Sequence, residues 1–117
     1  MNHRQLEIDG NLIHVCNSEW TFETKVMEAV ELNNKIIVIF DYMDFDAFPK
    51  DQPANNISAY DKQRTLLWTT TEHPTGHQTS AYVGFLPSDR LRVYNFAGFA
   101  CFIDENTGAL LECEFTK

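Results

Sequence analysis

The sequence predicts an all-β or β-dominated fold, built as a single antiparallel meander-type sheet or sandwich. Short runs rich in Val, Ile, Phe and Tyr recur along the chain, and turn signals separate them at short intervals, which is typical of antiparallel β proteins. The hydrophobic content of 44% and the aromatic content of 13% favour a folded globule over a disordered chain. No linker or low-complexity tract divides the 117 residues, so we expect one domain over residues 1–117.

The first third of the chain gives two strand predictions and one ambiguity. Residues 4–9 alternate between apolar and polar side chains, Asp9-Gly10 supplies the left-handed backbone of a hairpin turn, and residues 12–15 form the next strand. The apolar residues between 19 and 32 suit one helix face or two strand pieces. One short helix near residues 19–32 therefore remains an alternative to strands in the predicted fold.

The most apolar run is IIVIF, residues 36–40, and we expect it to be a central strand. Asn33-Asn34 precede it and predict a tight turn, because Asn tolerates the left-handed region. The last third reads as a meander of three or four strands. Its expected strands are residues 81–86, 91–96, 99–104 and 109–115, joined by turns at 87–89, 97–98 and 104–108.

The charge balance is strongly acidic, with 17 acidic residues against nine basic ones and a net charge of −8 at pH 7. Phosphate backbones are bound by basic surfaces, so we expect no direct nucleic-acid ligand. An acidic surface attracts a basic protein partner, although it also simply keeps proteins soluble. No run approaches the ~20 apolar residues of a membrane span, and the N-terminus lacks an apolar signal segment. We therefore expect a cytoplasmic protein without membrane contact.

The three cysteines, Cys16, Cys101 and Cys113, are odd in number and widely spaced, and no CxxC pair occurs. That pattern disfavours a zinc site built from cysteine pairs. We expect three reduced thiols packed in the core. Cys16 lies two residues after His14, and we favour packing over a catalytic Cys-His dyad for this pair.

Two stretches of the second half carry a family resemblance. Residues 56–68, NISAYDKQRTLLW, contain Asn-Ile-x-x-Tyr-Asp, a turn, and a strand ending in Trp. Residues 91–117 contain Tyr-Asn-x-x-Gly-Phe, then Ile-Asp-x-x-Thr-Gly, then Glu-Phe-Thr-Lys. Together they resemble a group of small bacterial proteins, some of which resemble or serve as immunity proteins of polymorphic toxin systems, including contact-dependent growth inhibition. The resemblance is weaker over residues 26–40, and the usual Gly of the first turn is replaced by Gln63-Arg64. It implies a shared fold and class of role, without assigning any functional residue.

The chief candidate site is DYMDFDAFPK, residues 41–50. Its acids do not follow the calcium-loop spacing, which also requires a Gly at the sixth position, and a contiguous triplet does not form a catalytic carboxylate pair. Aromatic side chains among acids are typical of an interface for a basic partner. Equally, the aromatics can pack beneath the loop while the acids cap turns. The candidate partner-binding residues are Asp41, Tyr42, Asp44, Phe45 and Asp46, with Glu72 as a neighbour.

A metal site is the alternative for His73 and His77, which are four residues apart beside Glu72. Pro74 and Gly76 lie between them and argue against the continuous helix that would align both rings. We favour structural or solvent-exposed histidines, and we expect neither a metal nor another cofactor.

Function is predicted from these observations together. Neither a nucleophile elbow nor a glycine-rich phosphate loop occurs in the sequence, so we expect a protein that is not an enzyme. The resemblance and the charge predict an immunity protein that binds and neutralises a cognate bacterial toxin domain, such as a basic nuclease, by occluding its active cleft. The alternative is a small-ligand or metal-binding β module without catalysis. Because edge strands of a meander can pair with another chain, a homodimer is a further expectation.

Overall fold

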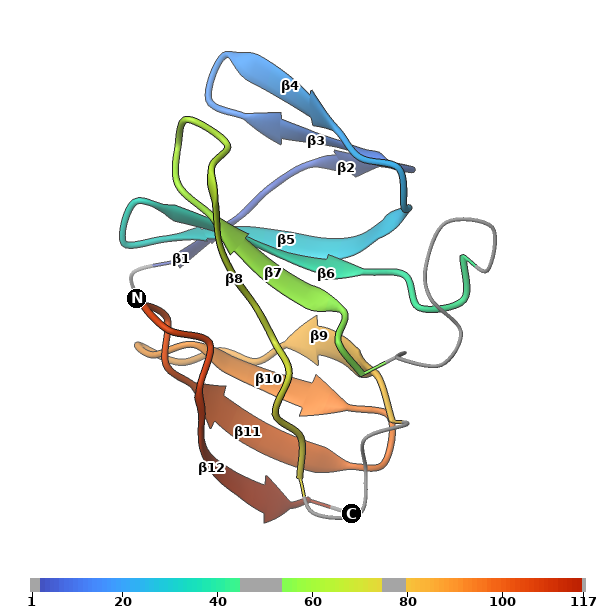
Figure 1. Ribbon diagram of the computed structural model, residues 1–117, viewed down its shortest axis with the longest axis vertical. Helices are drawn as coiled ribbons and strands as arrows, with labels where there is room; N and C mark the ends of the chain where they lie inside the picture. Colours follow the sequence, from blue (N-terminus) through green and yellow to red (C-terminus); the bar gives the residue numbers. More distant parts are fainter. Residues whose placement is uncertain (1–2, 45–53, 75–79, 117) are drawn as a thin grey trace.

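The computed structural model describes residues 3–44, 54–74 and 80–116, and these residues form β-strands and turns without any helix (Figure 1). The all-β prediction is therefore confirmed, and the alternative of a short helix near 19–32 is wrong. All strand pairs are antiparallel and form three sheets. Figure 1 shows these sheets as three layers, with the five-stranded sheet in the middle. Within the described residues no helix is available to cross a membrane.

The middle layer is a five-stranded sheet with the order β1-β5-β6-β7-β8. Its strands are β1 (His3–Gln5), β5 (Val26–Leu32), β6 (Lys35–Phe40), β7 (Ile57–Tyr60) and β8 (Leu66–Thr69). The predicted run 36–40 thus lies in β6, the central strand of this sheet. The turn before it is the expected Asn33-Asn34 pair, whose φ angles are 49° and 66°.

β6 is apolar at consecutive positions because both faces of the middle sheet are covered. Ile37 and Ile39 belong to the core shared with the C-terminal sheet, whereas Ile36 and Val38 belong to the core shared with the N-terminal sheet. All four are fully buried. A strand buried on both faces loses the apolar/polar alternation of a half-exposed strand, which explains the unbroken IIVI sequence.

The N-terminal sheet has the order β2-β3-β4, with β2 (Ile8–Asp9), β3 (Leu12–Val15) and β4 (Ser18–Thr21). The Asp9-Gly10 turn is as predicted, with Gly10 at a φ of 63°. The single strand expected at residues 4–9 is instead divided between two sheets. Leu6 still donates to Ala29 O of the middle sheet at 2.9 Å, whereas Glu7 O accepts from His14 N at 3.0 Å. The chain therefore passes from one layer to the next within two residues.

The C-terminal sheet is the predicted meander, with the order β12-β11-β10-β9. Its strands are β9 (Tyr82–Phe85), β10 (Arg92–Asn95), β11 (Phe99–Ile103) and β12 (Leu110–Phe115). Gly98 and Gly108 have φ angles of 98° and 79° and lie in the turns that precede β11 and β12. Both turns were expected at these glycines.

The side chain of Asn56 joins the middle and C-terminal layers. It is fully buried, and its Nδ2 donates to Phe40 O at 2.9 Å and to Tyr82 O at 2.8 Å. Its Oδ1 accepts from Tyr82 N at 3.1 Å. A buried amide normally needs partners of this kind, because an unpaired polar group in the core is costly. Asn56 thus fixes the end of β6 against the beginning of β9.

The cysteine prediction is wrong on two points. Cys101 and Cys113 are joined by a disulfide, and Cys16 is exposed. The pairing follows from strand register, because Cys101 on β11 lies directly opposite Cys113 on β12, with their Cα atoms 4.1 Å apart. Cys16 lies in the β3–β4 turn at a φ of 55° and so leaves the strand face that would have buried it.

Candidate functional site

The acidic corner after β6 is the site predicted from sequence, and residues 41–44 of it are described. Asp41 Oδ1 accepts a 2.9 Å hydrogen bond from the Met43 backbone N–H. Asp44 Oδ2 accepts a 2.9 Å bond from the Lys25 backbone N–H, and Lys25 O accepts from Asp41 N at 2.8 Å. The Asp44 carboxylate and the Asp41 backbone N–H thus hold the corner against the segment that enters β5. The Asp41 carboxylate instead closes a turn within the corner, and both carboxylates have structural roles of the kind expected for Asp in turns.

The apolar part of this corner is divided between buried and exposed groups. Tyr42 is half-buried, whereas Met43 is 59% exposed. Phe45 and Asp46 lie outside the described residues. A partner-binding role for the corner remains a prediction, and Asp41 and Asp44 now have a local function that does not require a partner.

Glu72 lies between β8 and β9, beside the start of β12. Its Oε1 accepts a 2.8 Å hydrogen bond from Leu110 N, and its backbone O accepts one of 3.3 Å from the Tyr82 hydroxyl. Burial, together with the Glu72 carboxylate, raises the pKa of Tyr82 to about 12, so this hydroxyl remains a neutral donor. None of the described hydrogen bonds links Glu72 to the acidic corner.

His73 follows Glu72 and faces the C-terminal layer. Its Nε2 lies 2.8 Å from Asn55 Oδ1, and its buried Nδ1 has no described hydrogen-bond partner. Burial lowers the pKa of His73 below the usual value, and the adjacent Glu72 carboxylate opposes that effect. The described residues hold no group of three His, Cys, Asp or Glu side chains able to bind a metal ion. His77 lies outside the described residues, so the metal alternative gains no support and stays a prediction.

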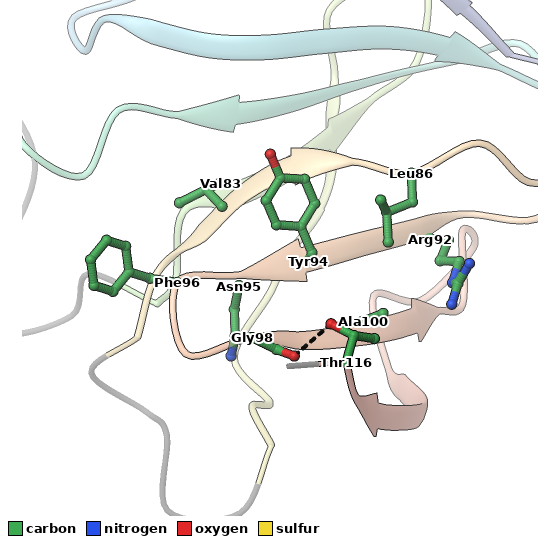
Figure 2. A pocket seen from close by; sticks show the side chains of 9 residues that line it. All are labelled: Val83, Leu86, Arg92, Tyr94, Asn95, Phe96, Gly98, Ala100 and Thr116. Carbon is green, nitrogen blue, oxygen red and sulfur yellow. Dashed lines mark hydrogen bonds between the residues drawn. The ribbon is translucent and has the colours of Figure 1, made fainter.

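A pocket of about 580 Å³ opens on the outer face of the C-terminal sheet, at a place the sequence did not indicate. We call it the Tyr94 pocket. Figure 2 shows Phe96 and Arg92 at opposite ends of it, with Tyr94 between Val83 and Leu86. Its wall consists of Val83, Leu86, Arg92, Tyr94, Asn95, Phe96, Gly98, Ala100 and Thr116. Most of these groups are apolar, and Phe96 is 66% exposed.

The ring of Tyr94 packs over Gly84, where the absence of a side chain leaves room for it. A Cβ atom at Gly84 would lie 2.6 Å from Tyr94 Cε1 and 2.8 Å from both the Tyr94 hydroxyl and Glu28 Oε2. Glu28 is itself fixed, because its Oε1 accepts a 3.2 Å hydrogen bond from Phe85 N. A partly exposed aromatic ring that packs closely against the sheet is suited to be an interface anchor, since little conformational freedom is lost on binding.

Charged groups of both signs lie beside the Tyr94 pocket on the same face of the sheet. Arg92 Nη2 is 3.4 Å from Glu114 Oε1, and the Arg90 guanidinium carbon lies 3.9 Å from the centre of the Phe102 ring. Glu112 and Glu114 are exposed on β12. The face thus combines a central aromatic pocket with a charged border, which is the general arrangement of protein interfaces.

A period-two pattern could have revealed this face. Arg92, Tyr94 and Phe96 alternate with the buried residues Val93 and Asn95. Large side chains at alternate positions share one face of a strand. What the sequence does not show is whether a further layer covers that face.

A family model described as a domain of unknown function (DUF7957) matches residues 3–115. The chain belongs to this family. No curated protein and no solved structure matches the DUF7957 chain. The Tyr94 pocket and the acidic corner therefore have to be interpreted from their own geometry.

Proposed function

We propose that this chain is a non-enzymatic immunity protein, which binds a cognate bacterial toxin domain in the cytoplasm and neutralises it. The net charge of −8 favours a basic partner, such as a nuclease domain. The sequence resemblance to immunity proteins of polymorphic toxin systems supports the same class of role. Binding across the toxin's cleft would exclude its substrate without any chemistry by this chain.

The exposed pair Tyr94 and Phe96 is the observation that carries this proposal. Binding energy in protein interfaces is concentrated in a few aromatic and Arg side chains near the centre. The Tyr94 pocket supplies such a centre, and it can receive an apolar side chain from the toxin. Glu112 and Glu114 border the same face and are placed to meet basic groups of the toxin.

The proposed mechanism is occlusion. A standard interface buries about 1,600 Å² in total, which one face of a small domain can supply. Charge attraction brings association rates towards ~10⁸ M⁻¹s⁻¹ at low salt. The acidic corner is the second docking candidate for the same partner, through Tyr42 and Met43 together with the acids.

Where a neighbouring gene encodes a toxin domain, co-expression of that domain with this protein tests the function. Cells should survive, and the two chains should co-purify. Death of the cells despite this protein, with no co-purification, would rule the proposal out.

Variants then locate the interface. Tyr94→Ala with Phe96→Ser should abolish protection while the thermal midpoint falls only slightly, because both side chains are substantially exposed. Leu111→Ser is the matched control, since Leu111 is a 55% exposed apolar residue of β12 outside the Tyr94 pocket. Loss of protection on Met43→Ser alone would move the interface to the acidic corner.

A small-ligand β module is the second candidate, favoured by the volume and apolar wall of the Tyr94 pocket. 1-Anilinonaphthalene-8-sulfonate, an aromatic anion, is a suitable probe. If the pocket stores a ligand of this kind, the probe should bind and raise the thermal midpoint, and Val83→Trp should remove both effects. Protection of cells by the Val83→Trp chain would show that immunity needs neither a small ligand nor a toxin side chain in this pocket.

A further inference from the structure

The carboxylate of Glu28 lies beside the Tyr94 hydroxyl, at the free edge of the C-terminal sheet. β9 is the last strand of that sheet, and Glu28 reaches it from β5, where its Oε1 accepts the 3.2 Å hydrogen bond from Phe85 N. A Cβ atom added to Gly84 would lie 2.8 Å from Glu28 Oε2 and also 2.8 Å from the Tyr94 hydroxyl oxygen. The two oxygens are therefore at most twice that distance apart.

The charge of Glu28 is not neutralised within the part of the chain that the structure describes. None of the ion pairs between described residues includes Glu28. The described hydrogen bond from Phe85 N uses Oε1 and leaves Oε2 without a described donor. Glu28 is part-buried, and a carboxylate that is partly withdrawn from water is stabilised by a nearby cation. A positive charge brought by a partner would therefore bind favourably at this edge.

The arrangement of the oxygens favours an ammonium group over a guanidinium group. A guanidinium binds a carboxylate best when both carboxylate oxygens accept from it in parallel. One oxygen of Glu28 is already occupied by Phe85 N, so only Oε2 is left for a cation. An ammonium group is a compact charge with three N–H donors. It can donate to Glu28 Oε2 and to the Tyr94 hydroxyl oxygen together, while its third donor faces water.

The wall of the Tyr94 pocket suits the aliphatic stem of a lysine side chain. Figure 2 shows the Tyr94 ring between Val83 and Leu86, with its hydroxyl on the side away from Arg92. Lysine stems cover apolar surface while their charged heads remain at a polar edge. Arg92 opposes such a cation only weakly, because its Nη2 lies 3.4 Å from Glu114 Oε1.

We propose that the Tyr94 pocket binds a lysine side chain of the basic partner, whose ammonium nitrogen donates to Glu28 Oε2 and to the Tyr94 hydroxyl oxygen. The inference rests on the proposed function, which supplies a basic protein partner. Charge complementarity selects this occupant, since the net charge of −8 attracts a basic surface and Glu28 places a carboxylate at the pocket itself. An apolar side chain alone would leave Oε2 unpaired.

A pair of small lysine analogues tests the pocket without any toxin. Nα-acetyl-lysine-N-methylamide carries the ammonium group, and the norleucine compound has the same stem without it. In a titration followed by amide NMR shifts, the lysine compound should saturate with a Kd on the order of millimolar. The largest shifts should lie at Gly84 and Phe85. The norleucine compound should bind about threefold more weakly or worse, because it cannot pair with Glu28.

Conservative variants separate the charge from the fold. Glu28→Gln keeps an oxygen that can accept from Phe85 N, so the thermal midpoint should change little while the Kd of the lysine compound rises about threefold or more. Tyr94→Phe removes only the hydroxyl and should also weaken binding. Glu19→Gln is the matched control, because it removes the same charge from an exposed position on β4, outside the Tyr94 pocket.

Three results of the titration overturn the proposal. The first is an absence of saturable shifts with the lysine compound, and the second is equal binding of the norleucine compound. The third is a Kd that Glu28→Gln leaves unchanged. Tighter binding of the corresponding arginine compound would also show that lysine is the wrong occupant.

A toxin domain that this protein neutralises provides the second test. Glu28→Gln should raise the dissociation rate of the complex more than about tenfold, whereas Glu19→Gln should leave it unchanged. If the wild type protects cells and the Glu28→Gln complex dissociates at the wild-type rate, the immunity function stands and the lysine site is wrong. If the wild type does not protect cells, the immunity function is wrong, and the titration with the lysine compound still decides the pocket.

Discussion

The indole Nε1 of Trp68 donates a 2.8 Å hydrogen bond to the backbone oxygen of Glu105, joining β8 of the middle sheet to the β11–β12 hairpin loop. The Glu105 carboxylate extends this junction, since its Oε2 lies 3.2 Å from Lys35 Nζ and its Oε1 accepts from Asn33 Nδ2 at 2.9 Å. Three segments far apart in sequence therefore meet at one hairpin loop. Gly108 closes the junction, because its Cα lies against the Trp68 ring.

Gly108→Ala is expected to destabilise the protein for two separable reasons. Its φ of 79° is left-handed, which costs a residue with a Cβ about 1–2 kcal/mol. The new Cβ would also lie 2.6 Å from Trp68 Cε3, and such overpacking typically adds about 1–3 kcal/mol. Gly10→Ala is the matched control, since Gly10 has a φ of 63° and no atom within 4 Å of an added Cβ. Denaturant unfolding should show the larger loss for Gly108→Ala, and equal losses would remove the Trp68 contact as a cause.

The free energy of unfolding should decrease as the pH is lowered, because of His73. Burial lowers the pKa of His73 in the folded chain, whereas the unfolded chain titrates near the usual 6.5. Between the two values the unfolded state binds more protons, so the free energy of unfolding decreases as pH falls below about 6.5. Above 6.5 both states are neutral at this residue, and the contribution is fully present.

His73→Gln should flatten that pH dependence. Thermal midpoints measured from pH 5 to pH 8 should fall less steeply towards low pH for the variant than for the wild type. The comparison at pH 8 corrects for the lost contact with Asn55, because His73 is neutral there. An unchanged profile would assign the acid sensitivity to other groups.

Two substitutions at Asp44 separate the structural role of the acidic corner from a role in binding. Asp44→Lys removes the acceptor for Lys25 N, and we expect a loss of about 1–2 kcal/mol. Asp44→Asn keeps a side-chain oxygen in that position, so its loss should stay below about 0.5 kcal/mol. If the corner docks a basic toxin, both variants should slow association measured by stopped flow. Slower association with Asp44→Lys alone would indicate a disturbed corner instead of a lost charge.

Local signals in the sequence predicted most of the strands and turns, because they depend on neighbouring residues. Asn33-Asn34 and Gly108 required left-handed backbone, and the meander followed from short apolar runs between such turns. The arrangement of the three sheets in layers was harder to predict from the sequence. The run 36–40 shows burial on both faces but does not show which segments cover each face. The division of residues 4–9 between two sheets depends on Leu6 pairing with Ala29, which is a long-range contact.

The candidate site was less predictable for the same reason. The acids at 41 and 44 stood out in composition, and the bond from Met43 N to Asp41 is local. The bond from Lys25 N to Asp44, however, depends on how β6 ends against the segment that enters β5. The Tyr94 pocket exists because the outer face of the C-terminal sheet lacks a further layer among the described residues. No local pattern in the sequence shows whether such a layer is present.

The disulfide was missed because it depends on strand register, and it gives a direct chemical prediction. The native chain should expose one thiol to a colorimetric thiol reagent, that of Cys16, and reduction under denaturing conditions should raise the count to three. Closing a loop of this size contributes about 3 kcal/mol in the chain-entropy account. Part of that is already supplied by the pairing of β11 with β12, so Cys101→Ala with Cys113→Ala should lower the free energy of unfolding by about 1–3 kcal/mol. Cys16→Ser is the control and should change stability little, because its thiol is exposed. Three reactive thiols in the native, unreduced chain would show that the bond does not form in solution.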